Sequence, residues 1–186
     1  GLRGGEHLVG EIDLRRVDRP LPFEAEGGAA AGRRAVAVQE GGAHGRQPAG
    51  VGGPGDGRWS STELRAREEV RTILDTPDLR MATTCVQVPV VSTHSASLHL
   101  TFDRRLTRDD AVRALTEGSN SVVVLDDPMR QEWPTPVDVV GTDPVFVGRV
   151  RQPGDFPRAL ELFVCVDNLR KGSALNMLQI AELVAC

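Results

Sequence analysis

Residues 96–102 read ASLHLTF, and this strict alternation of apolar and polar side chains predicts a β-strand with one buried face. The side chains expected on that face are Ala96, Leu98, Leu100 and Phe102. A run rich in Thr and Val at residues 81–91 predicts a neighbouring strand, as do residues 121–125, 145–151 and 160–166. Strands outnumber helices and come in neighbouring runs. This order favours an α+β fold with a largely antiparallel or mixed sheet.

Helix signals flank these strands. Ser60 and Glu63 have the spacing of a capping box, in which hydroxyl and carboxylate groups satisfy the first N–H groups of a helix. Thr107 and Asp110 have the same spacing before a second helix. A last helix is predicted over residues 173–184. Its apolar stripe is expected to contain Ala174, Met177, Leu178 and Ala181.

The first part of the chain has a different composition. Residues 1–60 hold 15 of the 20 glycines, and such segments offer little apolar surface to offset backbone entropy. We therefore expect residues 1–59 to be poorly ordered, apart from a short strand at residues 8–14, and residues 60–186 to form the domain. A linker, a disordered tail and a stretch read out of frame would all have this composition.

Length, charge and cysteine count exclude several classes of protein. The 186 residues suffice for one domain with a tail, and no run approaches the roughly 18 to 20 apolar residues that a membrane-spanning helix needs. A net charge of -4 argues against general nucleic-acid affinity. Three cysteines without a close ligand pair predict neither a disulfide framework nor a metal site. We expect a cytoplasmic protein that binds neither membrane nor nucleic acid.

Two residues could carry chemistry. Cys85 and His94 could form a nucleophile–base pair, although a cysteine within a Thr/Val strand is more typical of core packing. His94 lies in a polar interruption between two strand-like runs, where an imidazole can titrate near neutrality and act as a general base. A solvated loop histidine is the competing interpretation. His99 alternates onto the polar face and is expected to be structural or exposed.

Several blocks in order resemble the aspartate-semialdehyde dehydrogenase family over roughly residues 63–183. The blocks are TCVQVPV (84–90) with HS (94–95), WPTP (133–136), DPVFVGRVRQ (143–152), DNLRKGSALN (167–176) and QIAEL (179–183). The resemblance implies the C-terminal domain of a glyceraldehyde-3-phosphate-dehydrogenase-like enzyme, with helices on one face of its sheet. It also implies NADPH-dependent reductive dephosphorylation of aspartyl phosphate, on the route to lysine, threonine and methionine.

The resemblance also implies roles for individual residues. His94 falls on the family's acid–base histidine, and Gln87 falls where the family has an arginine that binds the substrate carboxylate. Arg65 falls on the lysine of an E-x-x-K pair that binds phosphate. Asn168 and Gln179 match positions that approach the nicotinamide of NADP.

In the family, a nucleotide-binding domain and the nucleophilic cysteine precede the matched part. We therefore expect a chain that is incomplete and inactive alone, that forms a homodimer, and that handles an acyl phosphate or aldehyde. The last helix normally packs against the nucleotide-binding domain, so we expect association or poor solubility without it. Two alternatives remain open: a non-catalytic homologue acting as a dimerisation module, which Gln87 favours, and an independent small enzyme or binding module built around His94.

Overall fold

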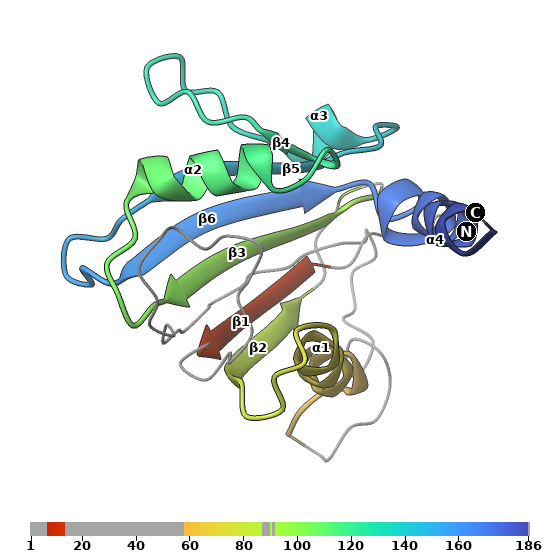
Figure 1. The fold of residues 1–186 in the computed structure, drawn as a ribbon, viewed down its shortest axis with the longest axis horizontal. Coiled ribbons are helices and arrows are strands. Elements are labelled where there is room, and N and C mark those ends of the chain that lie inside the picture. Colours follow the sequence, from red (N-terminus) through yellow and green to blue (C-terminus); the bar gives the residue numbers. More distant parts are fainter. Residues whose placement is uncertain (1–6, 14–57, 87–89, 91, 186) are drawn as a thin grey trace.

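The computed structural model describes residues 7–13, 58–86, 90 and 92–185, and its centre is one six-stranded sheet. The strands are β1 His7–Asp13, β2 Arg80–Val86, β3 His94–Thr101, β4 Val122–Val124, β5 Val145–Arg151 and β6 Ala159–Val166. Their order is β2-β1-β3-β6-β5-β4 (Figure 1). The β1/β2, β3/β6 and β5/β6 pairs are antiparallel, whereas β1/β3 and β4/β5 are parallel. The predicted α+β fold with a mixed sheet is confirmed.

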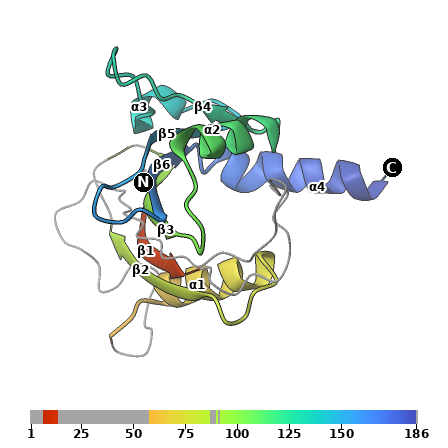
Figure 2. The ribbon, with the colours of Figure 1, turned by 60° about the vertical axis from the view of Figure 1, so that its left-hand side comes forward.

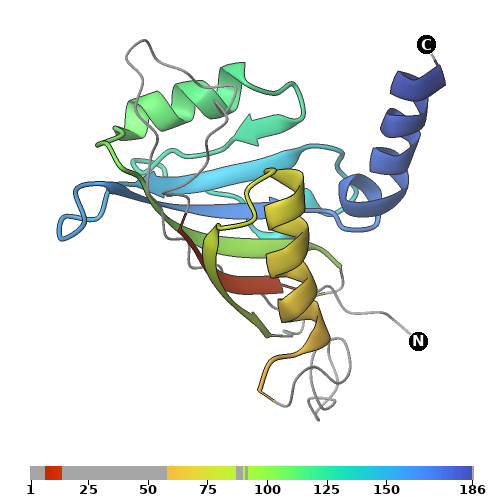
Figure 3. The same cartoon turned by 60° about the horizontal axis from the view of Figure 1, so that its bottom comes forward.

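Two helices cover one side of this sheet (Figure 2), and the last helix extends away from it (Figure 3). They are α1 Ser61–Ile73, α2 Arg108–Glu117, α3 Pro136–Val139, a π-helix at Arg170–Ala174 and α4 Leu175–Ala185. Both α1 and α2 lie on the same side of the sheet (Figure 2). In contrast, α4 extends away from the strands (Figure 3). None of the helices in the described part of the chain has the length and apolar character needed to cross a membrane.

The main core lies between the sheet and α2. Its buried members are Ala111, Val147, Val150, Leu160 and Leu162. Three of the residues expected on the buried face of β3 pack against this cluster, namely Leu98, Leu100 and Phe102. A second, smaller cluster surrounds Leu79, where Val70 and Leu74 of α1 pack. The alternation of residues 96–102 therefore identified the correct face.

Both predicted capping boxes are present. Ser60 and Glu63 exchange their side-chain and backbone hydrogen bonds at the start of α1, and Thr107 and Asp110 do so at the start of α2. Glu63 has a further contact, because its Oε1 accepts a 2.8 Å hydrogen bond from the backbone N–H of Cys85. This buried carboxylate therefore caps α1 and also ties α1 to β2.

Three predicted elements compare with the structure in different ways. The described part of the second strand ends at Val86, and residues 87–89 and 91 of the predicted strand lie outside the described residues. The last helix begins as a π-helix, in which the N–H of Gly172 bonds to the carbonyl of Asp167, five residues earlier. Close to the predicted strand at residues 8–14, β1 lies between β2 and β3. The proposed domain boundary at residue 60 stays a prediction.

Candidate functional site

His94 is the first residue of β3, where a buried polar corner meets the sheet. Its strand partner is Val166, near the end of β6, and the imidazole is half-buried. The residues on either side, Thr93 and Ser95, are buried. His94 therefore stands at the edge of the core and is not a solvated loop residue.

Asn168 lies directly beside this corner. Its Oδ1 accepts a 2.7 Å hydrogen bond from the backbone N–H of Thr93, which precedes His94. The preceding residue, Asp167, is buried and accepts hydrogen bonds from the N–H groups of Gly141 (2.7 Å) and Leu169 (2.9 Å). The residues that follow β6 are thereby bonded to Thr93 before β3, to Gly141 before β5 and to Leu169 in the next turn. Two of the residues expected at the site, His94 and Asn168, are brought together.

Gln179 lies on α4, and its Oε1 accepts a 2.5 Å hydrogen bond from Lys171 Nζ in the π-helix. The same π-helix is held by Arg170, which pairs with Asp143 at 2.5 Å. Arg170 lowers the pKa of the Asp143 carboxyl by this hydrogen bond and by its charge. The segment that leads from β6 to Gln179 is thus anchored to the loop before β5.

The other two expected site residues are Arg65 and Gln87. Arg65 lies on the exposed side of α1, which packs on β2, while β1 separates β2 from β3. The structure therefore does not place Arg65 with His94. Gln87 lies outside the described residues. The roles of all five residues stay predictions.

The two cysteines among the described residues, Cys85 and Cys165, are packing residues and not exposed nucleophiles. Cys85 is buried in β2, as expected for a structural residue. Cys165, in β6, is fully buried, and burial raises the pKa of its thiol, while the Ser95 hydroxyl, 3.1 Å away, offsets part of this effect. A protonated, buried thiol is a poor nucleophile. Within the described ranges, no group of three His, Cys, Asp or Glu residues could hold a metal ion.

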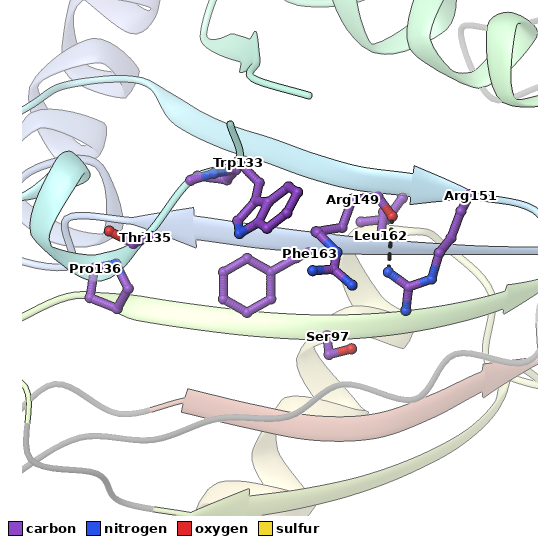
Figure 4. A pocket seen from close by; sticks show the side chains of 9 residues that line it. Ser97, Trp133, Thr135, Pro136, Arg149, Arg151, Leu162 and Phe163 are labelled. Carbon is purple, nitrogen blue, oxygen red and sulfur yellow. Dashed lines mark hydrogen bonds between the residues drawn. The ribbon is translucent and has the colours of Figure 1, made fainter. Parts of the chain in front are cut away.

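The sheet also carries a pocket on the face turned away from the main core. Ser97 pairs with Phe163, and the register puts both on the opposite face from Leu98 and Leu160. The pocket has a volume of about 350 Å³. It is lined by Ser97, Trp133, Pro134, Thr135, Pro136, Arg149, Arg151, Leu162 and Phe163 (Figure 4).

A β-bulge shapes this pocket. The register of β5 against β6 shifts between Gly148 and Arg151, and Arg149 has a positive φ of 56°. The guanidinium of Arg149 lies 4.7 Å from the centroid of the Trp133 ring, in cation–π contact (Figure 4). The buried carboxylate of Asp126 accepts the N–H groups of Arg149 (2.8 Å) and Val150 (3.2 Å), so it holds the bulge in place.

This pocket was not predicted from the sequence. The WPTP block was quoted only for its resemblance, and the signal that could have drawn attention was an indole, Trp133, in a stretch otherwise poor in core residues. Its partners, Arg149 and Phe163, come from two different strands. Their convergence depends on strand pairing that no local pattern specifies.

Comparison with known proteins agrees with the sequence resemblance. The family model for the dimerisation domain of semialdehyde dehydrogenases matches residues 51–171. The aspartate-semialdehyde dehydrogenase of Prochlorococcus marinus is 41% identical over 66% of this chain and 35% of the relative. That of Corynebacterium glutamicum is 45% identical over 66% of this chain and 34% of the relative. The chain thus spans about a third of the length of these relatives.

Solved structures give the same result. Aspartate semialdehyde dehydrogenase II from Vibrio cholerae is similar with a TM-score of 0.63 and 27% identity, covering 73% of this chain and 39% of that chain. A probable aspartate-semialdehyde dehydrogenase from Pseudomonas aeruginosa is similar with a TM-score of 0.63 and 27% identity, covering 76% of this chain and 43% of that chain. The fold and the sequence blocks therefore point to the same family.

Proposed function

Because the chain belongs to the semialdehyde dehydrogenase family through its dimerisation domain, we propose that it is the acid–base and dimer-forming part of an aspartate-semialdehyde dehydrogenase. Such an enzyme carries out the NADPH-dependent reductive dephosphorylation of aspartyl phosphate. One observation carries the proposal: His94 begins β3 beside the end of β6, where Asn168 bonds to the residue before it. Both residues lie within the matched range.

We assign the proton transfers to His94. In the direction of semialdehyde oxidation, a ring nitrogen takes the S–H proton of an attacking thiol while the carbon–sulfur bond forms and the carbonyl π bond breaks. The imidazolium then gives this proton to the former aldehyde oxygen, which becomes the hydroxyl of a hemithioacetal. The family resemblance places this thiol in the nucleotide-binding part. An imidazole at the boundary between core and solvent suits the task, because imidazole is the side chain that can both take up and release a proton near neutral pH.

NADP would accept or supply the hydride in this reaction. The donor chemistry of Asn168 and Gln179 fits its carboxamide, because each residue ends in an amide. The side-chain oxygens of both residues already accept hydrogen bonds within the chain, from Thr93 and Lys171. We therefore propose that their NH₂ groups, not their oxygens, would face a nicotinamide.

A hybrid enzyme tests the role of His94. The chain is combined with the nucleotide-binding part of the Corynebacterium glutamicum relative, and NADPH formation from semialdehyde, phosphate and NADP is measured. His94→Gln should lower kcat at least about a hundredfold, as expected for loss of a general acid–base group. The matched control is His99→Gln in the same strand, whose ring bonds to Glu161. Equal activities of the two variants, or robust NADPH formation by the chain alone, would contradict the proposal.

We also propose that the chain forms a homodimer through the sheet face that carries the pocket. Trp133, Phe163 and Arg149 gather there, and aromatic and arginine side chains are the groups enriched at protein interfaces. Because α1 and α2 lie on the opposite side, this face is the broad surface of the sheet left for a second copy. The matched family model, which describes a dimerisation domain, supports this proposal.

Sedimentation equilibrium tests the dimer. Trp133→Glu places a charge within the pocket and should shift the chain toward monomer, because an unpaired charge would be buried at the interface. The control is Met129→Glu in the neighbouring loop, a residue that is 93% exposed. A dimer that tolerates Trp133→Glu as well as Met129→Glu would place the interface elsewhere.

A separate surface is proposed for the nucleotide-binding part. Large apolar side chains of α4 are exposed over a surface wider than the predicted stripe, namely Met177, Leu178, Ile180, Leu183 and Val184. A helix face with this much apolar surface is normally buried against another element. We propose that the nucleotide-binding part covers α4, as the resemblance implies. We further place the protein in the cytoplasm, a proposal supported by its reduced, buried Cys85 and Cys165.

A non-catalytic dimerisation module is the second candidate function. The glutamine at residue 87 favours it, because a neutral amide binds a carboxylate less strongly than a bidentate guanidinium does. In the hybrid enzyme, Gln87→Arg should lower KM for the semialdehyde at least about tenfold if the site is otherwise competent. A hybrid that assembles but stays inactive with either residue would favour the module.

A further inference from the structure

Thr93 has an unusual backbone conformation. Its φ is 102°, whereas the other non-glycine residues with positive φ among the described residues have values between 50° and 57°. Those values lie within the left-handed helical region, and 102° does not. Thr93 is also β-branched, the class of side chain for which positive φ is least favourable. Something outside this residue must therefore hold it in place.

The surroundings of Thr93 provide few alternative contacts. The residue is completely buried, and its hydroxyl makes no hydrogen bond of ordinary geometry within the described structure, although it lies close enough to the Cys165 thiol to lower the pKa of that group. Its backbone N–H donates a 2.7 Å hydrogen bond to Asn168 Oδ1. A buried N–H group without an acceptor is costly, so this bond counts strongly in favour of the observed conformation.

Asn168 is itself on a rigid support. It follows β6 directly, and the carboxylate of Asp167 fixes the chain here by accepting the N–H groups of Gly141 and Leu169. The opposite strand partner of Val166 is His94. The amide of Asn168 therefore reaches across from the end of β6 to the start of β3, over 75 positions in the sequence.

We propose that Asn168 is a positioning residue for His94. By accepting the N–H of Thr93, it holds this threonine at its positive φ and so determines where β3 begins and how its first side chain is directed. This role rests on the proposed function of His94 as the acid–base group, and it is separate from any contact that the NH₂ group of Asn168 makes with a cofactor.

The positioning has a testable dependence on residue type. Removing the acceptor in Asn168→Ala leaves the Thr93 N–H unsatisfied, and the threonine should relax toward negative φ, which moves His94. Asn168→Asp keeps an oxygen acceptor at the same place and should preserve the corner. Glycine adopts positive φ without steric cost, so Thr93→Gly should restore the corner in the Asn168→Ala background.

Two-dimensional NMR of the histidine rings in the full chain reads this out. The sequence has four histidines, and His94→Gln identifies the His94 signal. His99 is an internal reference, because its ring contacts Glu161 and Phe156 at the other end of the strand. In Asn168→Ala, the His94 signal should shift or broaden with the His99 signal unchanged, and the Thr93 amide should lose about tenfold or more of its protection from hydrogen exchange.

The outcomes separate this proposal from the proposed function. An unchanged His94 signal in Asn168→Ala would overturn the positioning role, as would a double variant Asn168→Ala/Thr93→Gly that is no closer to wild type than Asn168→Ala. Equal shifts of the His94 and His99 signals would also overturn it, since they indicate general loss of packing. The NMR readout needs no activity, so an inactive hybrid with the expected shifts would reject the function of His94 and keep the positioning.

Discussion

Replacing Asp126 with asparagine tests how the bulge in β5 is held. One oxygen of this carboxylate accepts the N–H of Arg149, and the other accepts the N–H of Val150 (3.2 Å) and Nη2 of Arg108 (2.8 Å). The Asp126 side chain is only 4% exposed. If asparagine keeps its oxygen toward Arg149, its NH₂ group faces two donors in place of an acceptor.

The size of the effect follows from these contacts. A hydrogen bond to a charged group contributes about 1.5–3 kcal/mol, and a neutral one about 1 kcal/mol. Arg108 is 39% exposed, so water can solvate part of its guanidinium after the change. We expect the free energy of unfolding to fall by about 2–4 kcal/mol in Asp126→Asn.

Urea unfolding followed by circular dichroism measures this difference, with the slope m compared between variants. The matched control is Asp109→Asn, which affects the same guanidinium. Asp109 is 90% exposed and lies 3.5 Å from Arg108 Nη1, in the first turn of α2. Loss of an exposed pair and of a charge at a helix N-terminus should cost less than about 1 kcal/mol.

Equal losses of unfolding free energy in Asp126→Asn and Asp109→Asn would refute the reasoning, because a buried carboxylate that binds the bulge would then contribute no more than an exposed one. A second readout concerns the pocket. Since Asp126 holds Arg149 over Trp133, the asparagine variant should also weaken the proposed dimer, whereas Asp109→Asn should leave it unchanged. If the Asp126→Asn chain stays fully dimeric at low concentration, the bulge does not contribute to the dimer interface.

Three further predictions concern β5 and β6. Gly148→Ala should destabilise the fold by about 1–3 kcal/mol in thermal unfolding, because its Cβ would lie 2.3 Å from a backbone oxygen, whereas Gly154→Ala, with open space around it, should be nearly neutral. Burial raises the pKa of the Cys165 thiol above its unfolded value, near 9.0, so the folded state loses stability as the pH rises above about 9.0. Cys165→Ala should make the pH–stability profile flatter in this range. An unchanged slope would contradict the burial effect. Burial raises the pKa of the Glu161 carboxyl, but the hydrogen bond with His99 and the charge of Arg151 outweigh burial, so the net pKa is below 4.5. The stability that this carboxylate contributes is therefore lost as the pH falls through and below 4.5. Glu161→Gln should reduce this loss in the same pH–stability measurements.

Much of the fold could be predicted because its signals are local. The alternation in residues 96–102 identified the buried face of β3, and the S-x-x-E spacing located Ser60 as the N-cap of α1. The strand predicted at residues 145–151 coincides with β5. In each case, the decisive physical pattern lies within one element.

The sheet order and much of the site depend on contacts between distant parts of the chain. No local pattern could place β1 between β2 and β3, since strand pairing is a choice among several compatible registers. The bond between Asn168 and Thr93 depends on β6 lying beside β3, and the pocket depends on a loop that brings Trp133 to Arg149. The π-helix before α4 follows from the bond between Gly172 and Asp167, a spacing for which sequence offers no rule.

The apolar surface of α4 has a consequence for the life of the chain in a cell. Leu183 and Val184 are more than 80% exposed, and chaperones and proteases act on such uncovered apolar segments. A copy in which α4 stays uncovered would be degraded, and the steady-state amount of the protein would follow the fraction of copies in which this helix is covered. The helix would then act as a built-in check on correct assembly.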